Sequence, residues 1–203
     1  MEQHQGRRSE LAAVFGYPGV AGAYRYRPPY PAEVFEVLER IITDRPRRVL
    51  DIGAGEGALA RPLARRVDQV DAVEISAAMV ATGRRRPGGD HPALRWITGA
   101  AEDAPLGGPY ALVTAGASLH WMPWRPTLTR LAAAMTGHAY MASYVEHFHS
   151  TSSLARELMP GEDAAAFDRA VAGLVRPHAT DGLLDLPVVA DLAWGRITVT
   201  AAR

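Results

Sequence analysis

Residues 49–60 read Val-Leu-Asp-Ile-Gly-Ala-Gly-Glu-Gly-Ala-Leu-Ala, and this stretch decides the fold of the chain. Its first four residues form a short, mainly apolar run that predicts a buried parallel strand. Three glycines at alternate positions follow, and the chain is expected to become helical near Ala58. Glycines at this spacing allow a tight turn and let a ligand approach main-chain amides without meeting a Cβ. Because the free N–H groups of the following helix would face that ligand, the stretch predicts a nucleotide-type cofactor site.

The composition limits the classes of protein to which the chain can belong. Its 203 residues predict one domain with a sizeable core, and its formal net charge of zero gives no indication of nucleic-acid binding. No apolar run approaches the ~20 residues that a membrane span needs, so we expect a cytoplasmic protein without a membrane partner. The absence of cysteine excludes disulfides and thiolate catalysis. The sequence also contains no lysine, which excludes Schiff-base chemistry and the phosphate-loop lysine.

Short apolar segments alternate with amphipathic segments along much of the chain. Strands are expected at 49–52, 70–75, 94–98 and 110–115, and helices at 32–43, 59–66, 76–84 and 126–135. This alternation predicts an α/β fold with a doubly wound, mostly parallel sheet and helices on both of its faces. Ligands of such sheets bind at the carboxyl ends of the strands. The glycine turn and the segment after residue 115 should therefore lie at the same edge.

The second expected strand leads to Glu74, which lies 17 residues after Gly57. In dinucleotide-binding folds, an acidic residue about 20 residues after the glycine motif binds the ribose hydroxyls. A merely solvated strand-end charge is the alternative, and the neighbouring glycine turn favours the ribose role. The glycines also satisfy the dinucleotide fingerprint, so a nicotinamide cofactor stays open. Asp51 and the tight Gly-x-Gly-x-Gly spacing favour the other cofactor family that uses this type of sheet. The absence of the lysine that short-chain dehydrogenases require also counts against a nicotinamide cofactor.

Four motifs occur in the order typical of class I S-adenosylmethionine-dependent methyltransferases, which the chain resembles. They are Asp51-x-Gly53-x-Gly55-x-Gly57, Glu74-Ile75-Ser76-x-x-Met79, Gly99-x-Ala101-Glu102-x-x-Pro105 and Leu119-His120-Trp121. The similarity is greatest to the small-molecule "type 11" group, which typically opens with an arm like the one that ends at Pro31. The resemblance spans residues 24–135, and the combination is far more specific than any single motif. It implies a Rossmann-like fold, S-adenosyl-L-methionine as cofactor with S-adenosyl-L-homocysteine as product, and a small-molecule acceptor.

The resemblance also implies a set of cofactor-binding residues. They are Asp51, Gly53, Gly55, Gly57, Glu74, Ile75, Ala101, Glu102, Gly116 and Tyr30. Asp51 would reach the methionine amino group, and the glycines would pass under the methionyl and ribose parts. Glu74 would bind the ribose hydroxyls, Ile75 would pack on the adenine, and Ala101 and Glu102 would lie beside the adenine edge. The segment 116–120 would border the methyl-transfer site. Tyr30 would cover it, although its arm also reads as a surface segment packed by aromatic rings.

His120 is the candidate general base, because it follows a strand end beside the expected methyl group. A structural histidine stacked on Trp121 is the alternative reading. We expect no metal site: His147 and His149 lie near Glu146, but no third convergent ligand is evident. A hydrolase-type nucleophile turn at 116–118 is rejected, because its last glycine is replaced by His120.

The sequence departs from the family pattern in its second half. Ala111 stands where the fourth strand usually carries an aspartate, and Ala100 where many members carry an acid. After residue 135 a block of the family pattern is expected to be missing or reduced, which would leave a sheet edge beside the fourth strand. Residues 138–145 could form a shortened fifth strand, with 193–201 next to it. A partner chain in a homodimer is the alternative cover, and an open substrate pocket is the third option.

We therefore expect one methyltransferase-like domain over residues 1–203. It would consist of an N-terminal arm and helix (1–43), a cofactor-binding core (44–136) and a shortened C-terminal part (137–203). Three functions stay open. The first is methyl transfer to a small molecule. The second is cofactor binding without turnover in a regulatory or partner role, and the third is a nicotinamide-dependent oxidoreductase.

Overall fold

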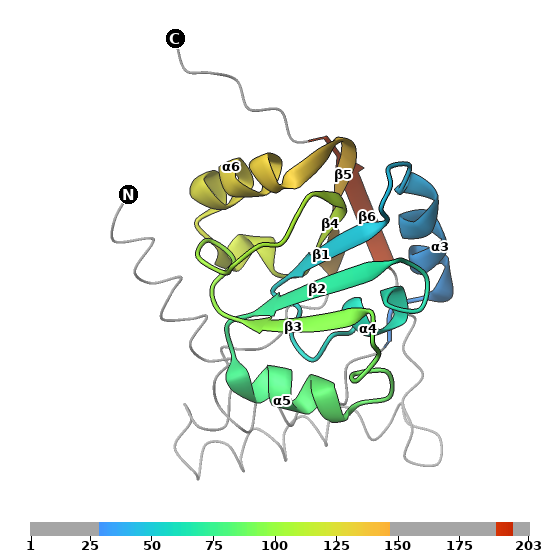
Figure 1. Ribbon diagram of the computed structural model, residues 1–203, viewed down its shortest axis with the longest axis vertical. Coiled ribbons are helices and arrows are strands. Elements are labelled where there is room, and N and C mark those ends of the chain that lie inside the picture. The colour runs from blue at the N-terminus through green and yellow to red at the C-terminus, as the bar shows by residue number, and fades with distance from the viewer. Residues whose placement is uncertain (1–28, 147–189, 197–203) are drawn as a thin grey trace, which may run out of the picture.

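The computed structural model describes residues 29–146 and 190–196, and it shows a six-stranded sheet with the strand order β3-β2-β1-β4-β5-β6 (Figure 1). The strands are β1 (Arg48–Ile52), β2 (Gln69–Glu74), β3 (Leu94–Thr98), β4 (Tyr110–Gly116), β5 (Met135–Glu146) and β6 (Ala190–Gly195). The helices are α3 (Ala32–Ile41), α4 (Ala60–Leu63), α5 (Ala77–Arg85) and α6 (Trp124–Ala134), with a short 3-10 helix η3 (Leu119–Trp121). The strands β1 to β5 are parallel, and β6 pairs antiparallel with β5. This order confirms the expected doubly wound, Rossmann-like fold class.

The expected elements lie close to their predicted bounds. β3 matches its expected range, and the other strands of the cofactor-binding half begin and end within about one residue of theirs. Ser76 caps α5 as expected, because its Oγ accepts a hydrogen bond from the main-chain N–H of Met79 at 3.3 Å. α4 is shorter than the predicted helix and covers only Ala60–Leu63. No helix in the described ranges is long and apolar enough to cross a membrane.

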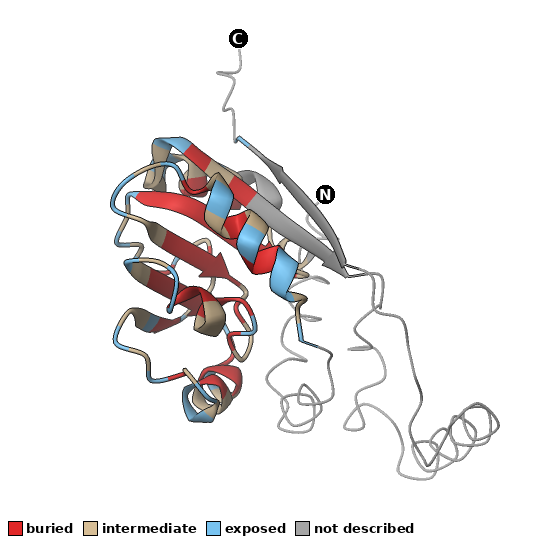
Figure 2. Ribbon diagram, turned by 90° about the vertical axis from the view of Figure 1, so that its right-hand side faces the viewer, coloured by how far each residue is buried: buried red, intermediate tan, exposed pale blue. Residues whose placement is uncertain are grey.

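Two apolar clusters cover the two faces of the sheet, and the central strands β1, β2 and β4 between them are almost entirely buried (Figure 2). On one face, Val49, Val70 and Leu112 pack against α3 and α4. On the other, Leu50 and Val113 pack with Leu131 of α6. Because alternate side chains of a strand point to opposite faces, both clusters need near-continuous apolar runs in the central strands.

β5 corrects one expectation. An edge beside the fourth strand was expected, but β5 has 12 residues and pairs with β4 from Leu112 opposite Tyr140 to Gly116 opposite Tyr144. The expectation of an exposed edge there is therefore wrong, and the alternative of a fifth strand over residues 138–145 is confirmed, although the strand is longer than expected. β6 then continues the sheet. Tyr140, Tyr144 and Val145 in this segment have high strand propensity, a signal that the comparison with the family pattern outweighed.

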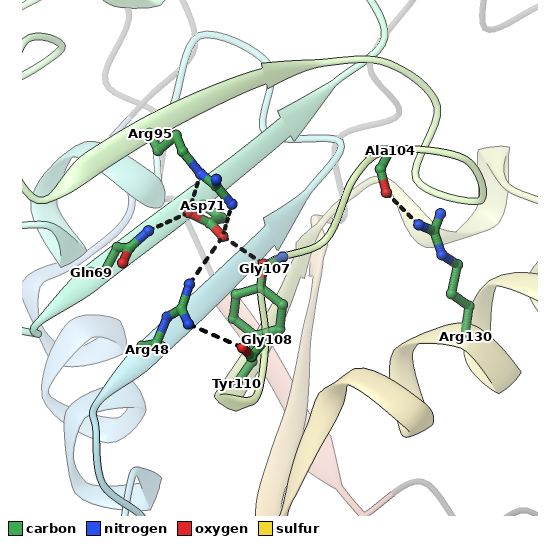
Figure 3. A network of polar contacts seen from close by, with 9 residues as sticks. All are labelled: Arg48, Gln69, Asp71, Arg95, Ala104, Gly107, Gly108, Tyr110 and Arg130. Carbon is green, nitrogen blue, oxygen red and sulfur yellow. Dashed lines mark hydrogen bonds and ion pairs between the residues drawn. The ribbon is translucent and has the colours of Figure 1, made fainter.

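A polar network ties the four strands β1 to β4 together at their amino ends, away from the glycine turn, and Arg48 of β1 joins it through an ion pair with Asp71 at 3.8 Å (Figure 3). The buried Asp71 carboxylate accepts hydrogen bonds from Gln69, from two nitrogens of Arg95 (2.9 and 2.7 Å) and from the Tyr110 hydroxyl (2.5 Å). Burial opposes its ionisation, but hydrogen bonds from Arg95, Tyr110 and Gln69 outweigh it, so the pKa of Asp71 is lowered. The network holds the strand register from the opposite end of the sheet, and no motif in the sequence predicted it.

Candidate functional site

The glycine turn leaves β1 at the carboxyl edge of the sheet. Gly53, Gly55 and Gly57 have φ angles of +61°, +57° and +80°, a region that side chains with a Cβ rarely occupy. A Cβ on Gly53 would also lie 2.4 Å from the Cβ of Ser118, at the end of β4. The turn is fastened to β2, because the N–H of Ala54 donates to the carbonyl of Val73 at 3.0 Å. The expected strand–turn–helix geometry is present, and it depends on glycine for its backbone angles.

Glu74 lies at the tip of β2, directly beside this turn. One carboxylate oxygen accepts from the N–H of Gly55 and the other from the N–H of Ser76, both at 2.8 Å. The residue is buried, and burial raises the pKa of its carboxyl despite these amide bonds. Two carboxylate oxygens offer about four acceptor positions, so amides on two of them leave capacity for further donors. Vicinal hydroxyls of a ribose are donors of that kind.

Asp51 is the last residue but one of β1 and pairs in register with Ala72 on one side and Thr114 on the other. Its side chain accepts a hydrogen bond from the Thr114 hydroxyl at 2.8 Å. Only 1% of the residue is exposed, and this burial raises its pKa to about 7, with a smaller contribution from the charge of Glu74. A buried carboxylate in this state gains from a cationic partner, because an opposite charge favours the ionised form.

Ile75 follows Glu74. It is a large apolar residue that is 55% exposed, whereas the other large apolar residues with described burial are buried or half-buried. Apolar surface of this kind gains free energy when an apolar ligand face removes it from water. Ala101 and Glu102 lie in the turn after β3; Ala101 is buried and Glu102 half-buried. Packing of Ile75 on an adenine, which the resemblance implied, stays a prediction.

Tyr30 lies over the end of β4. A Cβ on Gly116 would meet the Tyr30 hydroxyl oxygen at 2.7 Å and Cδ1 of Leu59 at 2.9 Å. The absence of a side chain at Gly116 is therefore what lets the tyrosine approach the strand. A cover over the transfer site, the role that the resemblance gave to Tyr30, stays a prediction.

The segment after Gly116 is held in a strained conformation. Ala117 has a φ of +51°, a left-handed angle that costs a non-glycine residue free energy. The Ser118 hydroxyl donates to the carbonyl of Ile52 at 2.7 Å and fastens the segment to the glycine turn. The main chain of His120 lies in η3, and its side chain lies outside the described part of the structure. Its role as a general base therefore stays a prediction.

No cluster of three potential metal ligands occurs among the described residues. His147 and His149, which were considered for such a site, lie outside the described ranges.

Trp96 and the Glu56–Arg86 ion pair stabilise the glycine turn, and the sequence analysis did not identify them. A Cβ on Gly57 would lie 2.6 Å from the Trp96 ring of β3, and one on Gly83 of α5 would lie 2.4 Å from it. Gly57 is therefore required by packing as well as by its φ angle. Glu56, between two of the glycines, points to Arg86 and forms an ion pair at 3.0 Å. A tryptophan in a strand beside a glycine motif was the available signal for this support.

Comparison with known proteins agrees with this geometry. Residues 49–138 match the sequence family described as "Methyltransferase domain". Trans-aconitate 2-methyltransferase from Mycobacterium sp. (strain KMS) is 34% identical over 114 residues, which cover 55% of this chain and 42% of that protein. Malonyl-[acyl-carrier protein] O-methyltransferase from Halalkalibacterium halodurans is 28% identical over 135 residues, with coverage of 64% and 47%. The chain thus spans under half the length of these two relatives.

Solved structures show the same fold at low sequence identity. A protein from Anaeromyxobacter dehalogenans described as a type II methyltransferase superposes with a TM-score of 0.54 at 24% identity, covering 75% of this chain and 60% of its own. The CcbJ methyltransferase from Streptomyces caelestis gives a TM-score of 0.52 at 21% identity, with coverage of 66% and 58%. Residues 49–138 thus match a methyltransferase domain, and the described residues have the fold of methyltransferases of known structure.

Proposed function

We propose that this chain binds S-adenosylmethionine at the carboxyl edge of the sheet and transfers its methyl group to a small-molecule acceptor. The observation that carries the proposal is the buried Glu74 carboxylate, which holds the amides of Gly55 and Ser76 while Ile75 beside it stays exposed. A polar acceptor next to an exposed apolar side chain is the arrangement that a ribose with its attached base requires.

The residues divide the work of binding. Glu74 accepts from the ribose hydroxyls, Ile75 packs on the adenine, and Asp51 meets the methionine amino group. Asp51 fits that group because its buried carboxyl gains from a cation. Tyr30 closes over Gly116 and limits access of water to the transfer site.

The reaction needs little acid–base chemistry from the protein. The bound cofactor supplies an electrophilic methyl group on a sulfonium, and the bond pair stays with sulfur when the methyl leaves. Aligning an acceptor atom with that methyl supplies most of the acceleration. The segment 116–120, fastened through Ser118, borders the place where the acceptor would be held. An acceptor atom that carries a proton would need a base, and His120 is our candidate.

We propose a small acid or its acyl derivative as the acceptor. The relatives are named for trans-aconitate and for malonyl-[acyl-carrier protein], and the second name specifies O-methylation. An ionised carboxylate attacks without a general base, because it has already lost its proton. With such an acceptor, His120→Gln would leave kcat within about a factor of three, whereas removal of a required base costs about 100-fold or more.

Titration calorimetry of the full chain tests the binding step. We expect S-adenosylhomocysteine to bind at micromolar strength and NAD not to bind. Glu74→Gln would abolish binding, because the glutamine NH2 would face a main-chain N–H that now has an acceptor. The exposed Glu33 on α3 provides the matched control, since Glu33→Gln would leave the affinity unchanged. Binding of NAD in place of S-adenosylhomocysteine would overturn the proposal.

Methyl transfer is measured separately, with isotopically labelled S-adenosylmethionine and a panel of small organic acids. Labelled ester product would support turnover. Binding without transfer across the panel would favour a cofactor-binding protein in a regulatory role. A cytoplasmic location and a homodimer stay predictions, and β5 now fills the edge that motivated the dimer.

A further inference from the structure

Arg130 on α6 contacts the turn that follows β3 (Figure 3). Its Nη1 donates to the carbonyl of Ala101 at 3.2 Å, and its Nη2 donates to the carbonyl of Ala104. One guanidinium therefore bridges two main-chain oxygens of a segment 26 to 29 residues away in the sequence. Both contacts are charge-assisted, and a planar guanidinium fixes their relative directions.

The turn depends on an external donor of this kind. The N–H groups of Asp103 and Ala104 both donate to the carbonyl of Ala100, at 3.0 and 2.8 Å, so residues 100–104 form a single helical turn. No further turn follows to donate to its later carbonyls. Ala101 and Ala104 are only 5% and 3% exposed, and a carbonyl without a donor is costly in such a place.

We propose that Arg130 is a positioning residue that fixes the turn of residues 100–104 against the adenine and thereby sets selectivity for that base. The inference rests on the proposed function, because this turn carries Ala101 and Glu102 beside the adenine edge. A carboxylate or a main-chain carbonyl accepts from the 6-amino group of adenine and repels a 6-oxo group. Discrimination between the two groups requires that residues 100–104 keep a fixed position. Arg130 joins this turn to α6, which follows the segment bordering the transfer site.

The test compares S-adenosylhomocysteine with S-inosylhomocysteine, which carries a 6-oxo group instead of the 6-amino group. We expect the wild-type chain to prefer the adenosyl compound. Arg130→Met would raise the Kd of the adenosyl compound by about tenfold, while the Kd of the inosyl compound changes much less, so the selectivity ratio falls toward one. Arg130→Lys would recover part of the ratio, because an ammonium can reach one carbonyl but lacks the fork that bridges two.

Arg84→Met is the matched control, since Arg84 is an exposed arginine within α5. It would leave both Kd values unchanged. Thermal melts of each variant show whether it is folded at the titration temperature, and Arg130→Lys keeps the test available if the methionine variant unfolds.

Failure of the inference is distinguishable from failure of the proposed function. If the wild-type chain binds neither compound, the function is wrong. If it binds and Arg130→Met keeps the wild-type ratio, or weakens both compounds equally, Arg130 has a structural role only and the inference is overturned.

Discussion

Burial of Asp51 makes the stability of this protein depend on pH in a defined direction. Its carboxyl ionises near 3.8 in an unfolded chain, whereas burial raises its pKa to about 7 in the folded state. The folded state therefore holds the proton between these values, and stability falls as the pH rises from about 4 to about 7. A pKa difference of about 3 corresponds to about 4 kcal/mol, at 1.36 kcal/mol for each pKa unit.

Asp51→Asn removes this ionisation and keeps the side-chain oxygen that accepts from Thr114. We expect the variant to exceed wild type in free energy of unfolding by about 4 kcal/mol near pH 8, and by about 1.5 kcal/mol near pH 5. Urea denaturation of both proteins at the two pH values measures the difference. The exposed Asp90 provides the control, because Asp90→Asn should give no pH-dependent gain. An equal gain for Asp51→Asn at both pH values, or a loss, would refute the reasoning.

The same carboxyl should link cofactor binding to proton release. An ammonium beside Asp51 favours its ionised form, so S-adenosylhomocysteine would displace close to one proton near pH 6 and almost none near pH 8.5. Calorimetry in two buffers of different ionisation enthalpy counts these protons. Equal proton release at both pH values would contradict a contact between Asp51 and the amino group.

Three further changes test other parts of the structure. Gly116→Ala places a Cβ 2.7 Å from the hydroxyl oxygen of Tyr30, and we expect it to raise the Kd of S-adenosylhomocysteine by at least about tenfold in calorimetry. An unchanged Kd would show that Tyr30 does not cover the site. Tyr110→Phe removes the hydroxyl that donates to Asp71 at 2.5 Å, and it should lower the free energy of unfolding by about 1–3 kcal/mol in urea denaturation. A decrease below about 0.5 kcal/mol would contradict a stabilising role of the network. Ala117→Gly relieves a φ of +51° and should raise stability by up to about 1 kcal/mol, so a clear loss in the same assay would argue against strain at this position.

Local signals in the sequence predicted the cofactor half of the fold well. The apolar run before Gly53 predicted a buried strand, and Glu74 stood at the spacing at which a strand tip meets the glycine turn. Ser76 predicted the start of α5, because a serine N-cap bonds the main chain of its own helix and needs no tertiary contact. In each case, the residues that decide the element are neighbours in the sequence.

The remaining features depend on contacts between distant residues. Asp71 reads as a polar interruption of a strand, and only the parallel register shows that Arg95 and Tyr110 surround it. Arg130 reads as an ordinary helix arginine until α6 is packed against the turn after β3. The fifth strand was underestimated because the comparison with a family pattern was weighed above the strand propensity of residues 135–146.

The most direct test of the central claim is a crystal structure of the full chain with S-adenosylhomocysteine. The account predicts ligand density along the glycine turn, with the ribose hydroxyls within hydrogen-bonding distance of Glu74 and the adenine on Ile75. Density at another place, or a Glu74 side chain that makes no contact with the ribose, would contradict it.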